Sequence, residues 1–103
     1  MPDSAVSDVA VGIVNYGSSL ELVRCLDSLS AAGFPFAQVV VVDNGPRFTV
    51  QDELRGRYEG LRFINPGVNL GFAGGANRAW REAHALGYRY GLILNPDVRV
   101  SPS

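Results

Sequence analysis

Residues 39–45 read Val39-Val40-Val41-Val42-Asp43-Asn44-Gly45, four β-branched residues that run directly into a turn. β-Branched side chains favour extended backbone, and a run without polar alternation predicts a strand covered on both faces. Asp, Asn and Gly in succession favour a tight turn. This segment therefore predicts a buried strand of a parallel sheet with polar side chains at its carboxyl end.

The same alternation of apolar runs, turns and helical spacing extends to both sides of this strand. Strands that alternate with helices predict an α/β class, with a mostly parallel sheet flanked by helices and each strand covered on both faces. The predicted strands are 9–14, 39–42, 62–64 and 90–94, and the predicted helices are 18–32, 50–58 and 71–86.

The composition suits one compact domain spanning 1–103, because the chain has 103 residues, 47% hydrophobic and 18% charged. A net charge of −1 gives no reason to expect nucleic acid as a partner. The polar, acidic start Met1–Asp8 has no basic segment before an apolar one, so we expect a cytoplasmic protein, at most peripheral to the inner face of a membrane.

Residue types that are missing exclude several kinds of site. All nine basic residues are arginine, which excludes a Walker P-loop, a Schiff-base lysine and a lysine general base. Absence of lysine also points to a GC-rich genome. A single cysteine, Cys25, and a single histidine, His84, exclude an internal disulfide and paired-histidine metal sites.

Some conspicuous side chains are better explained by packing than by chemistry. We interpret Cys25 as a buried hydrophobe on the first helix. Phe72 and Trp80 fall with alanines at helical spacing, which favours a core-facing stripe. The scattered arginines, Arg99 among them, we interpret as solvated surface.

Polar residues follow each predicted strand and should meet at one edge of the sheet, where ligands bind in open α/β folds. Asn15 and Tyr16 follow the first strand and Asp43 ends the second. An acidic residue at this place accepts hydrogen bonds from a ribose or a base in many nucleotide-binding folds. Capping of its own turn explains Asp43 equally well.

Two further segments end at the same edge. The loop Asn69–Arg78 is rich in glycine, which lets backbone amides approach a phosphate at a helix start, although a tight corner explains it equally well. The motif GxGxxG is absent, which disfavours an NAD site. Asn95-Pro96-Asp97 supplies a carboxylate of the kind that holds Mg²⁺ or Mn²⁺ beside nucleotide phosphates, although a plain strand-ending turn is its simpler explanation.

Taken together, four blocks of sequence resemble the family 2 inverting glycosyltransferases, and most closely their rhamnosyltransferase-like branch, in which Asn-Pro-Asp replaces Asp-x-Asp. The blocks cover residues 9–100 and are Ile13–Tyr16, Val41–Gly45, Asn69–Asn77 and Leu92–Asp97. This resemblance implies the Rossmann-like N-terminal half of a GT-A fold, with strand order 3-2-1-4. It also implies a bacterial role in cell-wall or polysaccharide biosynthesis.

The resemblance also implies roles for individual residues in binding a nucleotide-diphospho-sugar such as dTDP-rhamnose or a UDP-sugar. Asp97 would bind the divalent cation, Mg²⁺ or Mn²⁺, which neutralises the leaving diphosphate. Asn15 and Tyr16 would line the pocket for the base, and Asp43 would accept a hydrogen bond from the N3–H of the base or from a neighbouring group. Asn69, Gly71 and Arg78 would lie along the nucleotide and its diphosphate. Asn95 would support Asp97.

This chain departs from the family pattern at two places. Pro46-Arg47-Phe48 stands where the family usually has Ser or Thr followed by Asp. The general base that deprotonates the acceptor hydroxyl lies further downstream in the family, in the half that binds the glycan or lipid-linked acceptor, whereas this sequence ends at Ser103. We therefore expect a truncated domain that binds the donor without completing transfer, and that exposes apolar surface and self-associates.

Two alternatives stay open at this stage. The missing base favours a non-catalytic remnant of the same fold that serves as an interaction module. A sugar nucleotidyltransferase has a related sheet but normally carries Arg and Lys in a glycine-rich loop after the first strand, and residues 15–19 contain neither.

Overall fold

The computed structural model describes residues 8–16, 19–45, 49–54 and 56–99. The predicted cap Ser18 and the departure at Pro46–Phe48 lie outside these residues. The elements in chain order are β1 (Val9–Asn15), α2 (Ser19–Ala31), the 3-10 helix η1 (Phe36–Gln38), β2 (Val39–Asp43), α3 (Thr49–Glu53), β3 (Arg62–Ile64), α4 (Gly71–Ala85) and β4 (Tyr90–Leu94).

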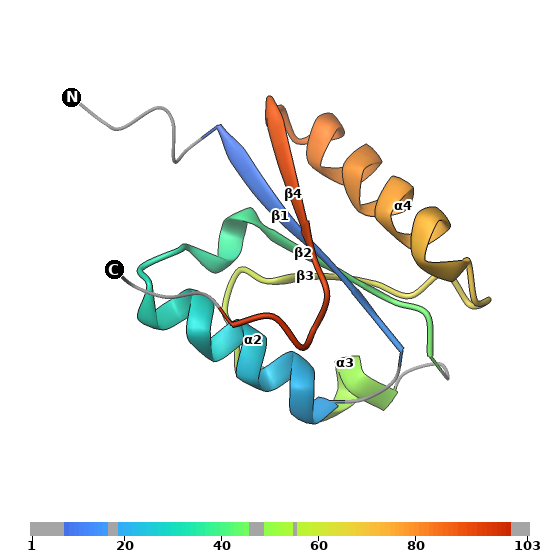
Figure 1. Cartoon of the computed structure of the whole chain (residues 1–103), viewed down its shortest axis with the longest axis horizontal. Helices are drawn as coiled ribbons and strands as arrows, with labels where there is room; N and C mark the ends of the chain where they lie inside the picture. Colours follow the sequence, from blue (N-terminus) through green and yellow to red (C-terminus); the bar gives the residue numbers. More distant parts are fainter. Residues whose placement is uncertain (1–7, 17–18, 46–48, 55, 100–103) are drawn as a thin grey trace.

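The four strands form one parallel sheet in the order β3-β2-β1-β4, which confirms the predicted class and strand order (Figure 1). Asn15 of β1 is in register with Asp43 of β2, and Ile13 is in register with Leu94 of β4. The carboxyl ends of three strands therefore come level at one edge of the sheet.

Helices cover both faces of this sheet (Figure 1). On one face, Val11 and Ile13 of β1 pack with the apolar side of α2, including Cys25, and with α3. Burial raises the pKa of the Cys25 thiol, so it is a packing group as predicted. On the other face, Val40 and Val42 of β2 pack against α4.

Helix α4 lies close to the sheet because its buried residues, Gly75, Ala79 and Ala83, are small. Gly12 of β1 is required at this contact, since a Cβ there would lie 2.9 Å from the Ala79 Cβ and 2.8 Å from Ile93 Cδ1. Large residues are therefore displaced to the flanks of the helix. The predicted core stripe is wrong for Phe72 and Trp80, whose side chains are exposed.

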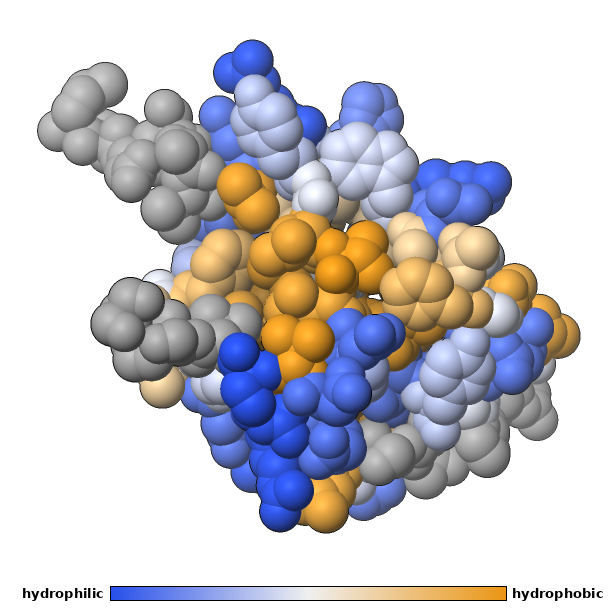
Figure 2. Space-filling model, in the orientation of Figure 1, coloured by the Kyte–Doolittle hydropathy of each residue, from blue (hydrophilic) through white to orange (hydrophobic). Residues whose placement is uncertain are grey.

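The prediction that each strand is covered on both faces is also wrong for β4. Tyr90 is 57% exposed and Leu92 is 52% exposed. In the described part of the chain β4 pairs with β1 alone, and α4 packs mainly on β1 and β2. Figure 2 shows the resulting hydrophobic surface at the centre of this view, over β4.

Helix α3 is shorter than the predicted 50–58, since it ends at Glu53. Gly56 has a φ of +79°, a left-handed conformation that ends a helix and that glycine adopts without strain. The chain then turns toward β3, and Tyr58 packs edge-on against Phe36 with 5.0 Å between the ring centroids. None of the helices in the described ranges has the length and apolar character needed to cross a bilayer.

Candidate functional site

A pocket of about 330 Å³ opens at the carboxyl edge of the sheet, between β1 and β4. This is the point at which strand order changes direction, β2 and β3 lying on one side of β1 and β4 on the other. Crevices at such points bind ligands in open α/β sheets. The lining residues are Val14, Asn15, Tyr16, Glu21, Asn95, Pro96 and Asp97.

Asn15 brings a buried amide to this pocket. Its side chain is 1% exposed, and its Nδ2 donates a hydrogen bond of 3.4 Å to Asp43 Oδ1. Its own Oδ1 is buried and accepts no hydrogen bond from the described residues. A buried acceptor without a donor is costly, so a ligand donor that reached this oxygen would be stabilised there.

Asp43 lies behind Asn15 and does not line the pocket. Its side chain is 2% exposed, and Oδ1 also accepts a 3.2 Å hydrogen bond from the Gly45 amide. This second contact is the turn capping that the sequence left open as an alternative. Asp43 thus fixes both its own turn and the orientation of the Asn15 amide.

The turn after β4 presents Asn95 and Asp97 to the pocket. The Val98 amide donates to the Asn95 carbonyl at 3.0 Å, which closes a four-residue turn. Pro96 occupies its second position, where the fixed φ of proline is favoured. Asp97 is exposed, so its carboxylate is accessible to a ligand.

Arg99 fastens this turn to helix α2. Its Nη1 donates to the carbonyls of Pro96 at 2.9 Å and Val98 at 3.0 Å, and its Nη2 lies 3.0 Å from Glu21 Oε1. Glu21 is in the first turn of α2, also pairs with Arg24 at 3.4 Å, and lines the pocket. Arg99 is thus exposed, as predicted, and in addition it ties the turn to α2, a contact that the sequence did not predict.

The glycine-rich loop lies beside the ends of β1 and β2, on the α4 side of the sheet. Asn69 Oδ1 accepts a 2.8 Å hydrogen bond from the Gly71 amide, and Gly71 has a φ of +74°. Asn44, directly after β2, bonds to this loop through both of its side-chain atoms. Asn69 and Gly71 do not line the 330 Å³ pocket.

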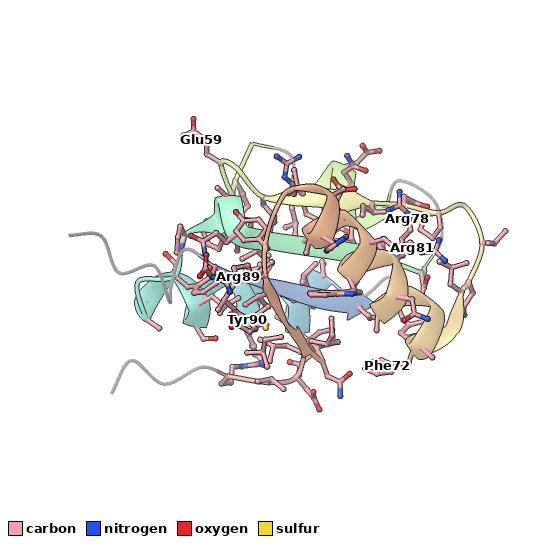
Figure 3. The ribbon with its side chains drawn as sticks, turned by 90° about the horizontal axis from the view of Figure 1, so that it is seen from above. Glu59, Phe72, Arg78, Arg81, Arg89 and Tyr90 are labelled. Atoms are coloured by element: carbon pink, nitrogen blue, oxygen red, sulfur yellow. The ribbon has the colours of Figure 1, made fainter. Side chains whose placement is uncertain are left out.

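Arg78 also lies apart from the pocket. Its Nη1 is 3.7 Å from Glu82 Oε1, and Arg62 of β3 lies 4.0 Å from the other oxygen of the same carboxylate. Figure 3 shows Arg78 and Arg81 on the side of α4 away from Phe72. The structure thus brings together Asn15, Tyr16, Asn95 and Asp97, with Asp43 behind them, and leaves Asn69, Gly71 and Arg78 outside this group.

Asp97 is the pocket residue that could hold a divalent cation shared with a ligand. Within the described ranges no three His, Cys, Asp or Glu side chains gather into a metal cluster. Mg²⁺ and Mn²⁺ need only one or two protein carboxylates when phosphates and water complete the shell. Asp97 meets this need, whereas Glu21 is already engaged by two arginines.

The sequence analysis assigned no role at the site to three residues: Glu21, Asn44 and Arg99. Asn44 gave a signal, since it directly follows Asp43 at the predicted edge. Glu21 and Arg99 gave none, because their contact joins residues 78 positions apart.

Comparison with known proteins gives a family and two kinds of relative. A family model described as Glycosyl transferase family 2 matches residues 10–103. The low-salt glycan biosynthesis hexosyltransferase Agl10 of Haloferax volcanii is 30% identical over 99 residues, which cover 93% of this chain and 30% of that protein. An uncharacterized protein of Mycobacterium tuberculosis is 40% identical over 68 residues, which cover 63% of this chain and 22% of that protein. The chain therefore spans less than a third of either relative, and no solved structure gives a significant match.

Proposed function

Because the chain belongs to glycosyl transferase family 2, we propose that the pocket between β1 and β4 binds the nucleotide-diphospho-sugar donor of a glycosyl transfer reaction. Its parallel sheet with helices on both faces is consistent with the Rossmann-like N-terminal half of a GT-A fold. The family as a whole uses such donors and transfers the sugar to an acceptor.

The observation that carries the proposal is that Asn15, which lines the pocket, has a buried Oδ1 with no donor among the described residues. An imide N–H of uracil or thymine, or a ribose hydroxyl, would supply that donor. Asp43 holds the amide through Nδ2, so the acceptor atom is directed away from Asp43. Tyr16 is 49% exposed at the same pocket and offers a ring on which a base can stack.

A divalent cation, Mg²⁺ or Mn²⁺, belongs to this proposal. Asp97 would hold it with Asn95 in support, both lining the pocket at the end of β4. The cation would neutralise charge on the departing nucleoside diphosphate. Asp97 itself supplies an accessible carboxylate on a turn that Arg99 makes rigid.

The residues proposed to contact the diphosphate lie further from the pocket than those proposed to contact the base and the cation. Asn69, Gly71 and Arg78 lie on the α4 side of the same sheet edge, outside the 330 Å³ pocket. A donor that extends from Asn15 across the end of β1 would reach the loop before Arg78. Arg78 would have to leave its 3.7 Å contact with Glu82 to reach a phosphate.

The finer activity is proposed on the resemblance to rhamnosyltransferases and on the printed name of the Haloferax volcanii relative, a hexosyltransferase. We propose an inverting transfer of a hexosyl group, from dTDP-rhamnose or a UDP-sugar, to an acceptor hydroxyl. The general base that deprotonates this hydroxyl would lie outside the 103 residues. Self-association of the chain also stays a prediction, which sedimentation at increasing concentration would test.

Titration of the ¹⁵N-labelled chain with UDP and with dTDP, in a buffer that contains Mg²⁺ and no Mn²⁺, tests donor binding residue by residue. The proposal expects the side-chain amide signals of Asn15 and the backbone signal of Tyr16 to shift with saturation. Signals on the exposed side of α4, such as Arg81, serve as the internal control. A titration in which neither nucleotide moves Asn15 or Tyr16 would overturn the proposal.

A further inference from the structure

Asn44 is a buried side chain that connects the end of β2 to the glycine-rich loop. Its side chain is 5% exposed, and its backbone amide donates to the Asn15 carbonyl at 2.7 Å. Its Nδ2 donates to the Gly71 carbonyl at 3.0 Å, and its Oδ1 accepts from the Leu70 amide at 3.2 Å. One residue therefore holds both the end of β1 and the loop.

Two attachments hold the loop at the sheet edge: the side chain of Asn44, and helix α4, which begins at Gly71 and packs on β1 and β2. In the described part of the chain, both side-chain hydrogen bonds between residues 69–71 and the sheet edge come from Asn44. The bond from the Gly71 amide to Asn69 Oδ1 is local and fixes only the shape of the turn. Removal of the Asn44 amide would thus loosen the loop before α4 and leave its turn intact.

The space around Asn44 is closed by α4. Gly75 faces it, and a Cβ at Gly75 would lie 3.1 Å from Asn44 Nδ2 and 2.7 Å from Val14 Cγ1. Asn44 does not line the pocket, and both of its side-chain polar atoms already bond to the loop. Its effect on a ligand would therefore act through the loop.

We propose that Asn44 is a positioning residue that holds Asn69–Gly71 in place beside Asn15 and Asp43, and that donor affinity depends on this placement. The inference rests on the proposed function for its second part, because only a donor that spans the sheet edge contacts both the pocket and the loop. Its first part concerns the loop alone and is measured without a ligand.

Hydrogen exchange at the Leu70 amide measures the loop contact directly. In Asn44→Ala this amide loses its acceptor, so it should exchange at least tenfold faster, while amides of β1 and β2 keep their protection. Asn44→Asp retains an oxygen for Leu70 and loses the donor to Gly71, so its Leu70 exchange should stay closer to wild type. Equal Leu70 exchange in Asn44→Ala and wild type would overturn the inference.

Affinity for UDP measured by calorimetry tests the second part. Loss of two neutral hydrogen bonds predicts affinity about tenfold weaker in Asn44→Ala. Val42→Ala is the matched control, since Val42 is buried in the same strand against α4 and its side chain cannot form a hydrogen bond to the loop. It should lose stability and keep its affinity within about twofold, which separates positioning from a general loss of packing.

The outcomes distinguish the two proposals. Failure of wild type to bind UDP or dTDP overturns the proposed function, and the Leu70 exchange then decides whether Asn44 holds the loop. Faster Leu70 exchange with unchanged affinity overturns Asn44 as a positioning residue for the donor. If Asn44→Ala does not fold, Asn44→Ser replaces it, because its side chain is too short to keep both hydrogen bonds to the loop. Faster Leu70 exchange and weaker affinity are then expected, and wild-type values would contradict the inference.

Discussion

Asn15 and Asp43 are register partners at the carboxyl ends of β1 and β2, and the 3.4 Å hydrogen bond between their side chains fixes which polar atom of the Asn15 amide is paired. The carboxylate can only accept, so it pairs with the amide nitrogen and leaves Oδ1 buried without a donor among the described residues. The pair thus converts two adjacent strand ends into a site with a defined acceptor.

Exchange of the two residue types tests this polarity. Asn15→Asp places two buried carboxylates against each other and should reduce the free energy of unfolding by roughly 1–3 kcal/mol. The double variant Asn15→Asp/Asp43→Asn restores one donor and one acceptor and should regain most of that loss. Urea denaturation of wild type, Asn15→Asp, Asp43→Asn and the double variant measures the coupling, and additive losses would contradict the hydrogen bond.

A second prediction concerns the tie between Arg99 and Glu21. Arg99→Ala should change the free energy of unfolding by at most about 1 kcal/mol, because exposed ion pairs contribute little. It should nevertheless weaken nucleotide binding in Mg²⁺ or Mn²⁺ several-fold, since the turn that carries Asp97 loses three hydrogen bonds.

Arg24→Ala is the control for this prediction, because Arg24 pairs with the same Glu21 carboxylate and makes no contact with the turn. Calorimetry should give it wild-type affinity. Equal nucleotide affinities for the Arg24 and Arg99 variants would show that Arg99 does not hold the Asp97 turn in place for binding.

The close packing of α4 on β1 gives a third prediction. Gly12→Ala adds a methyl group 2.8 Å from Ile93 Cδ1 and 2.9 Å from the Ala79 Cβ, which should cost about 1–3 kcal/mol of stability. Ile93→Val removes one of the two clashing atoms. Thermal melts should show the double variant to be less destabilised than the sum of the single changes, and strict additivity would place the clash elsewhere.

Tyr58 predicts an alkaline limit to stability. Burial, together with its 2.9 Å hydrogen bond to Asp27, raises the pKa of Tyr58 to about 12 from its ordinary value of 10.0. The folded state therefore retains the proton longer than the unfolded state. The resulting stabilisation is complete below pH 10 and is lost as the pH rises toward 12.

Tyrosinate absorbance of wild type minus that of Tyr58→Phe isolates this titration, and its midpoint should lie near 12. The variant should also lose less stability than wild type between pH 10 and 12. A midpoint at the ordinary value would show that the contact with Asp27 does not form in solution.

Most of the fold, but only part of the candidate site, could be predicted from the sequence. The four valines, and the glycines that end helices, are local signals, which is why the strands were predicted, whereas the strand order came from the family resemblance. Exposure of Leu92 on β4 was not predictable, since an apolar run looks alike whether one or both faces are covered. Trp80 was misplaced because it packs over Gly91, a contact that helical spacing does not encode.

The candidate site likewise contains residues that the sequence predicts and residues that it does not. Asn15 and Asp97 came from their places at strand ends, a rule of the fold that sequence alone can apply. Arg78 was assigned by resemblance, and its contact with Glu82 reflects side-chain packing on α4 that no motif describes. The tie from Arg99 to Glu21 depends on how the turn after β4 meets α2, which only the assembled structure shows.

Calorimetric titration of the chain with UDP and dTDP, with and without Mg²⁺ or Mn²⁺, tests the central claim most directly. The account predicts saturable binding of at least one nucleotide that strengthens with the cation and loses this dependence in Asp97→Ala, while Asp52→Ala, outside the pocket on α3, behaves as wild type. Absence of binding of either nucleotide with either cation, or an Asp97→Ala variant with the full cation dependence, would contradict it.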